Sequence, residues 1–87
     1  MSDIYAVTFE MEMLREFAAS LDARYWRYID KHGLELEDKE NPIVAYNGEI
    51  VDISEAVLSC DTLDELEVIK KRLKELRSIF EGLEEER

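Results

Sequence analysis

The stretch LEVIKKRLKELRSIFEGL, residues 66–83, has an apolar residue at every third or fourth position, and so does IYAVTFEMEMLREFAASLDARYWRY, residues 4–28. In an α-helix this spacing gathers the apolar side chains on one face, and two such faces bury each other. The sequence therefore predicts a mostly α-helical fold with a minor β part, built on an antiparallel hairpin of two long helices at residues 3–32 and 63–83. The apolar positions are Ile4, Val7, Met11, Leu14, Ala18, Leu21, Tyr25 and Tyr28 in the first helix, and Leu66, Ile69, Leu73, Leu76, Phe80 and Leu83 in the second.

The start of the first helix has an alternative. Residues 4–9 are rich in β-branched and aromatic residues, which also favour a strand. Helix is favoured because Ile4 and Val7 continue the spacing of Met11 and the apolar residues after it. Gly33 is a residue type that ends many helices in a left-handed conformation, so it predicts the end of this one.

The middle of the chain breaks the helical pattern. Pro42 disfavours helical geometry at the residue before it. Asn47-Gly48 is a strong signal for a two-residue hairpin turn, because both residues accept positive φ angles. The sequence predicts a β-hairpin over residues 43–52 and a short helix over residues 53–59. An isolated hairpin is marginal in water, so this one is expected to pack on the helices or on a partner.

The size of the chain predicts one domain, residues 1–87. A chain this short buries only about 60% of its unfolded surface, and such proteins often gain stability by oligomerising. Phe17 and Ile29 widen the apolar face of the first helix, and that width suits a bundle of three or four helices. A homodimer that forms a four-helix bundle is therefore predicted.

Acidic side chains outnumber basic ones 22 to 11, which gives a formal net charge of −11. This charge disfavours direct binding to nucleic acid or to an anionic membrane, because binding phosphate needs a basic footprint. The field favours a protein partner with a basic surface, such as a nucleic-acid-binding protein. Residues 33–61 hold eight acids against Lys39 alone, so the excess negative charge is concentrated between the two long helices.

Signatures of catalysis and metal binding are missing from the sequence. His32 and Cys60 are the single histidine and the single cysteine, so no histidine cluster, CxxC motif or internal disulfide is available. Phosphate-binding and hydrolase motifs are absent, and the acids that follow Glu35 lack the spacing of a calcium-binding loop. The sequence predicts a protein that is not an enzyme and has no cofactor or metal. Because no signal peptide or membrane-length apolar run is visible, a cytoplasmic location is expected.

The predicted partner-binding residues fall into two groups. Acids of the middle segment are expected to act electrostatically, by raising the rate of association with a basic surface. Two aromatic residues are expected to anchor the contact, because tryptophan and tyrosine are enriched at the centres of interfaces. For Trp26, burial by this chain's own hairpin or short helix is an open alternative. The predicted residues are Glu35, Glu37, Asp38, Glu40, Glu49 and Asp52 as electrostatic determinants, and Trp26 and Tyr46 as anchors.

Two functions are compatible with these features. The first is a small acidic binding protein that inhibits or modulates a larger partner. Compact acidic chains without disulfides are typical of phage-encoded inhibitors, including anti-CRISPR proteins that mimic nucleic acid, so this kind of viral anti-defence protein is predicted to act in the host cytoplasm. The alternative is a structural or assembly subunit, such as a chaperone-like coiled-coil homodimer.

Overall fold

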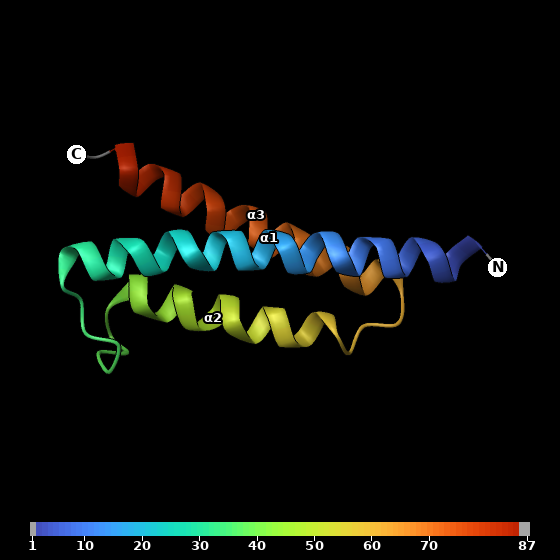
Figure 1. Cartoon of the computed structure of the whole chain (residues 1–87), viewed down its shortest axis with the longest axis horizontal. Helices are drawn as coiled ribbons and strands as arrows, with labels where there is room; N and C mark the ends of the chain where they lie inside the picture. Colours follow the sequence, from blue (N-terminus) through green and yellow to red (C-terminus); the bar gives the residue numbers. More distant parts are fainter. Residues whose placement is uncertain (1, 86–87) are drawn as a thin grey trace.

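The computed structural model describes residues 2–85, with side chains for residues 4–84, and these residues form three helices. They are α1 (Ser2–His32), α2 (Pro42–Val57) and α3 (Leu63–Glu85). Helix α2 runs back along α1, and α3 then runs in the same direction as α1 (Figure 1). The prediction of a mostly α-helical chain is confirmed. The antiparallel pairing of the two long helices is wrong, because α2 is long enough to return the chain to the end where α1 begins.

Local signals fix the ends of these helices. Gly33 has a φ of 63°, and the Leu34 N–H donates to the Ile29 carbonyl at 3.0 Å, which closes the C-terminus of α1. At the start of α3, the Glu65 N–H donates to Thr62 Oγ1 at 3.2 Å and the Thr62 N–H donates to Glu65 Oε1 at 3.1 Å. This reciprocal pair is a capping box.

The β-hairpin predicted for residues 43–52 is wrong, and residues 2–85 contain no strand. Asn41 caps α2 by accepting a hydrogen bond from the Ile43 N–H at 2.9 Å, and Pro42 occupies the first turn, where its missing N–H has no cost. Asn47-Gly48 lies inside the helix rather than at a turn. The short helix predicted for residues 53–59 is the second half of α2, which ends at Val57.

Apolar spacing explains why this segment is helical. Residues at three- and four-residue intervals along α2 face the core, and Val44, Ile50 and Val57 are buried there. Burial of this stripe against α1 outweighs the turn preference of Asn-Gly, since most helical stability comes from packing of an apolar face. Asn47 is also buried, and its Nδ2 donates to Asp22 Oδ1 on α1 at 2.6 Å, so its amide has a partner.

The core follows the predicted apolar faces of α1 and α3, with α2 as a third contributor. Most of the predicted positions are buried or packed against the core. Ile4 is the exception, at 70% exposed, because the first turns of α1 extend beyond the ends of α2 and α3 (Figure 1). The buried core residues are Leu14, Ala18, Leu21, Tyr25, Ile50, Val57, Leu66, Leu73, Leu76 and Phe80.

The width of the apolar face on α1 is explained by α2. Ile29 is buried and Phe17 packs against the core within a single copy of the chain. A second copy is therefore not needed to cover these two side chains, and the structure gives no support to a dimeric four-helix bundle. The homodimer stays a prediction.

Removing the Tyr25 hydroxyl tests a buried hydrogen bond between α1 and α3. This hydroxyl donates to the Leu76 carbonyl at 2.8 Å. We expect Tyr25→Phe to lower the free energy of unfolding by about 1 kcal/mol, the usual net value of one hydrogen bond. Burial, with a smaller effect of Tyr46, raises the pKa of Tyr25 to about 12.

The pKa of Tyr25 also predicts a pH dependence. Because the folded value is raised, its contribution to stability is complete below the ordinary tyrosine pKa of about 10 and is lost as the pH rises through 12. Urea titrations of both proteins between pH 8 and about pH 12 measure this loss. The phenylalanine variant should show a shallower decline, and identical declines would contradict the assignment.

Candidate functional site

Four of the predicted electrostatic residues lie together in the loop between α1 and α2. Residues 33–41 form this loop at one end of the bundle (Figure 1). We call Glu35, Glu37, Asp38 and Glu40 the acidic loop; all four are exposed. Within it the Glu40 N–H donates to Asp38 Oδ1 at 3.3 Å, and Lys39 is the single base. The loop therefore displays negative charge at one end of the bundle. It holds four of the eight acids of residues 33–61.

The other two predicted acids lie on α2, away from the acidic loop. Glu49 accepts two hydrogen bonds from Arg72 on α3, at 2.5 Å from Nε and 2.8 Å from Nη2. The hydrogen bonds from Arg72 hold the pKa of the Glu49 carboxyl below its usual value. Glu49 thus joins α2 to α3, and Arg72 already neutralises its charge. Asp52 is exposed on α2.

The two predicted aromatic anchors differ in exposure. Trp26 on α1 is 44% exposed, so neither α2 nor α3 covers it fully. Tyr46 on α2 is half-buried and packs against the core, which gives it a structural role within the bundle. The structure does not bring Trp26 and Tyr46 together with the acidic loop into one compact site.

Apolar side chains that were not predicted to bind a partner are exposed at the other end of α1. Ile4, Tyr5, Phe9 and Met13 are 70%, 80%, 64% and 47% exposed, and we call them the apolar ridge. Tyr5, Phe9 and Met13 follow one another at intervals of four, so they share one face of the helix. This face differs from the buried one, which carries Leu14. The spacing was visible in the sequence, but the stronger core stripe on the same helix obscured it.

Cys60 and His32 do not form a pair of nucleophile and base. His32 ends α1, whereas Cys60 precedes α3 at the opposite end of the bundle (Figure 1). Burial raises the pKa of the Cys60 thiol, with smaller contributions from Glu65 and Asp61, so the reactive thiolate is disfavoured. The His32 ring stacks on Tyr28, with ring centroids 4.1 Å apart. Neither the Cys60 thiol nor the His32 ring is thus placed for catalysis with the other.

The described residues contain neither a metal site nor a membrane-spanning helix. Across residues 2–85, no three His, Cys, Asp or Glu side chains are placed to hold a metal ion. No helix in the same part of the chain has the length and apolar character needed to cross a membrane. The acidic loop and the apolar ridge are the two surface features described above, one charged and one apolar.

Comparison with known families decides the assignment of the chain. The model of the bacterial epsilon antitoxin family matches residues 3–83, nearly the whole sequence. The chain belongs to the bacterial epsilon antitoxin family. Its similarity extends to Antitoxin PezA of Streptococcus pneumoniae serotype 4 (strain ATCC BAA-334 / TIGR4), with 30% identity over 64 residues. That alignment covers 72% of this chain and 40% of PezA, so the chain matches well under half of the relative's length. No solved structure matches the sequence.

Membership of the epsilon antitoxin family refines the functional predictions. An antitoxin family agrees with a small, protein-binding inhibitor. It gives no support to the prediction of an anti-CRISPR-like phage protein, because both matches are to bacterial antitoxins. A protein-binding, inhibitory role could be predicted from the sequence. The class of partner could not, because no short motif in the chain indicates a toxin.

Proposed function

We propose that this chain is a non-catalytic antitoxin that binds a protein toxin directly and holds it inactive in the bacterial cytoplasm. Membership of the epsilon antitoxin family supports the class of partner. The observation that carries the proposal is the apolar ridge on α1, whose four large apolar side chains are 47–80% exposed. Contiguous exposed apolar surface of this kind typically marks a protein-binding site.

The chemistry of the ridge fits the centre of an interface. Tyr5 and Phe9 offer large rigid surfaces, and aromatic residues dominate the binding energy of protein contacts. The ridge lies on a helix that the core already stabilises through Leu14 and Leu21. Near Phe9 and Met13, where Val7 and Met11 pack against the core, binding therefore requires little ordering of the backbone, which lowers the entropic cost of association. A helix that presents such a face suits an apolar groove on the toxin.

In the proposed function, the acidic loop attracts the toxin electrostatically. Its four exposed carboxylates lie at the end of the bundle opposite the ridge. We expect them to attract a basic surface on the toxin and to raise the rate of association more than they raise affinity. Trp26 and Asp52, which are exposed, extend the proposed contact region, whereas Glu49 and Tyr46 support it from within the bundle.

Charge reversal in the acidic loop tests this steering. We expect Glu35→Lys/Glu37→Lys to lower the association rate constant by about tenfold at low salt, with a smaller effect at high salt because salt screens the field. Stopped-flow or surface plasmon resonance with the purified toxin measures the rate. Glu55→Lys/Glu67→Lys changes the net charge equally at exposed positions elsewhere and is the matched control. Equal rates for both double variants would contradict the role of the loop.

Capture followed by a growth assay tests the proposed function itself. The tagged chain is used to capture binding proteins from a lysate of its native host at low and high salt. Each captured protein is then produced in a test bacterium with and without this chain. We expect one captured protein to arrest growth when it is produced alone and to lose this effect when the chain is produced with it. Growth arrest that the chain does not relieve would contradict the proposal.

A further inference from the structure

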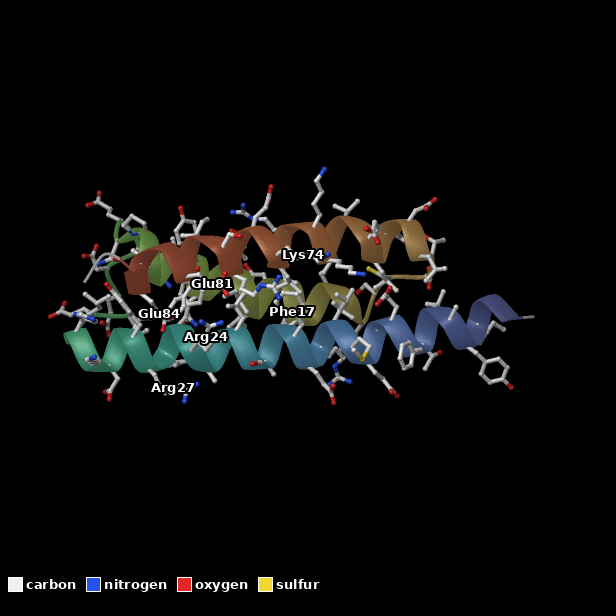
Figure 2. The ribbon with its side chains drawn as sticks, turned by 90° about the horizontal axis from the view of Figure 1, so that it is seen from above. Phe17, Arg24, Arg27, Lys74, Glu81 and Glu84 are labelled. Atoms are coloured by element: carbon white, nitrogen blue, oxygen red, sulfur yellow. The ribbon has the colours of Figure 1, made fainter. Side chains whose placement is uncertain are left out.

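We infer that the groove between α1 and α3 binds an acidic amphipathic helix of a protein partner. The groove lies where the two parallel helices meet on the side away from α2 (Figure 2). Three adjoining hollows form it: the middle one shares Phe17 with one neighbour and Arg24 with the other. The hollow at the end nearest the acidic loop, bounded by Lys31 and Glu84, has a volume of about 370 Å³.

The charge of the groove is opposite to that of the chain. Five cationic and three anionic side chains line it, although the whole chain carries 11 bases and 22 acids. Nearly half of all bases therefore gather in one groove. This reversal of sign favours an anionic occupant. The cations are Arg24, Arg27, Lys31, Lys70 and Arg77.

Two of the guanidinium groups are held against aromatic rings. Arg77 lies over Phe17, 5.1 Å from the ring centroid, and Arg24 lies over Phe80 at 5.0 Å. Such a cation–π contact restrains the guanidinium group, and N–H groups that face away from the ring can bind a carboxylate. Arg24 already donates to Glu84 at 2.9 Å. Among the described side chains, no salt bridge is formed by Arg77, so its donors remain for a partner.

Figure 2 looks onto the side of α1 and α3 where the groove lies. Figure 2 shows Phe17 between the two ribbons, with Arg24 directed from α1 toward Glu84 and with Lys74 and Glu81 on the α3 side. The floor is apolar, since Phe17, Leu21 and Phe80 contribute to it. An apolar floor between charged edges fits a helix with an apolar stripe flanked by acids.

The length and surroundings of the groove favour a helix from a partner. The α1 residues that line it, 10–31, span about 30 Å at 1.5 Å per residue, which matches a helix of about 20 residues. Nucleic acid is disfavoured by the net charge of −11. A second copy of this chain is disfavoured because it carries the same net charge of −11, which opposes self-association. A fourth helix laid on α1 and α3 would complete a four-helix bundle.

The inference rests on the proposed function for the identity of the partner, a toxin, but its test does not need the toxin. The probe is a fluorescein-labelled helical peptide of about 18 residues, with leucine on one face and glutamate on the flanks. A companion peptide carries lysine in place of glutamate. Fluorescence anisotropy measures binding of each peptide to the intact chain.

The groove variant is Lys70→Glu/Arg77→Glu, which leaves the Arg24–Glu84 salt bridge intact. We expect it to weaken binding of the glutamate peptide by about tenfold, equivalent to about 1.4 kcal/mol. The matched control is Arg15→Glu/Lys71→Glu, which changes net charge equally at exposed positions outside the groove. It should change the affinity by no more than about twofold. The groove variant should not weaken binding of the lysine peptide, and circular dichroism should show both variants folded.

Three results would overturn the inference. The first is no binding of the glutamate peptide to the wild-type chain, and the second is equal weakening by the groove and control variants. The third is a wild-type dimer, seen by sedimentation, that the groove variant converts to a monomer, because this would assign the groove to a second copy. Peptide binding without any captured toxin would instead contradict the proposed function alone, so the two failures are distinguishable.

Discussion

Replacing Phe9 with aspartate is expected to lower affinity for the toxin by about 30-fold, or about 2 kcal/mol, while the bundle stays folded. Phe9 is 64% exposed, so its removal costs the core little. In the proposed complex the same ring is desolvated at the centre of the contact, where an aspartate would bury an unpaired charge. Isothermal titration calorimetry with the captured toxin measures the affinity, and urea unfolding measures stability.

Val68→Asp is the control for the loss of an exposed apolar residue. Val68 is 70% exposed, but it lies on α3 rather than on the apolar ridge. We expect this variant to bind the toxin with wild-type affinity. If Phe9→Asp also bound at wild-type strength, or if Val68→Asp were the weaker binder, the ridge would not be the centre of the interface.

Replacing Leu73 with aspartate is expected to unfold the protein. Leu73 is fully buried where α3 meets the other helices. Truncating a buried leucine typically costs about 3–5 kcal/mol, and burying a carboxylate adds to this cost. A domain of 87 residues has a total stability of only about 4–13 kcal/mol. Circular dichroism at 222 nm, followed through urea titration, measures the loss.

Val68→Asp again supplies the matched comparison, because it places the same charge on an exposed position of α3. Its free energy of unfolding should change by no more than about 0.5 kcal/mol. A cooperative, wild-type-like unfolding transition for Leu73→Asp would contradict the position of α3 in the core.

The long helices were predictable because their signals agree with one another. In α3 the apolar spacing and the capping box at Thr62 and Glu65 both indicate one helix. In α1 the core stripe continues to Ile29 and Gly33 ends the helix. The relative direction of α1 and α3 was not predictable, since it depends on whether the intervening segment crosses the bundle.

The intervening segment was misread because two local signals conflicted. Asn47-Gly48 favours a turn, whereas Val44, Ile50 and Val57 follow helical spacing. Packing of that stripe on α1 outweighs the turn preference, and the hydrogen bond of Asn47 to Asp22 gives the buried amide a partner across the helices. No local pattern shows a contact between residues so distant in the sequence.

The candidate site was only partly predictable for a similar reason. The acidic loop follows from composition, and its exposure agrees with its charge. The neutralisation of Glu49 by Arg72 depends on how α2 and α3 pack, so sequence could not reveal it. The apolar ridge was not predicted because the core spacing on α1 is the stronger pattern. Ile4 belongs to that core spacing and is exposed because α1 extends beyond its neighbours.

The most direct test of the proposed interface is site-specific photo-crosslinking in the toxin complex. A benzophenone amino acid is placed at position 9 in one protein and at position 68 in another, since both native side chains are exposed. The apolar ridge predicts an efficient crosslink to the toxin from position 9 and none from position 68. A crosslink from position 68 alone would contradict the account.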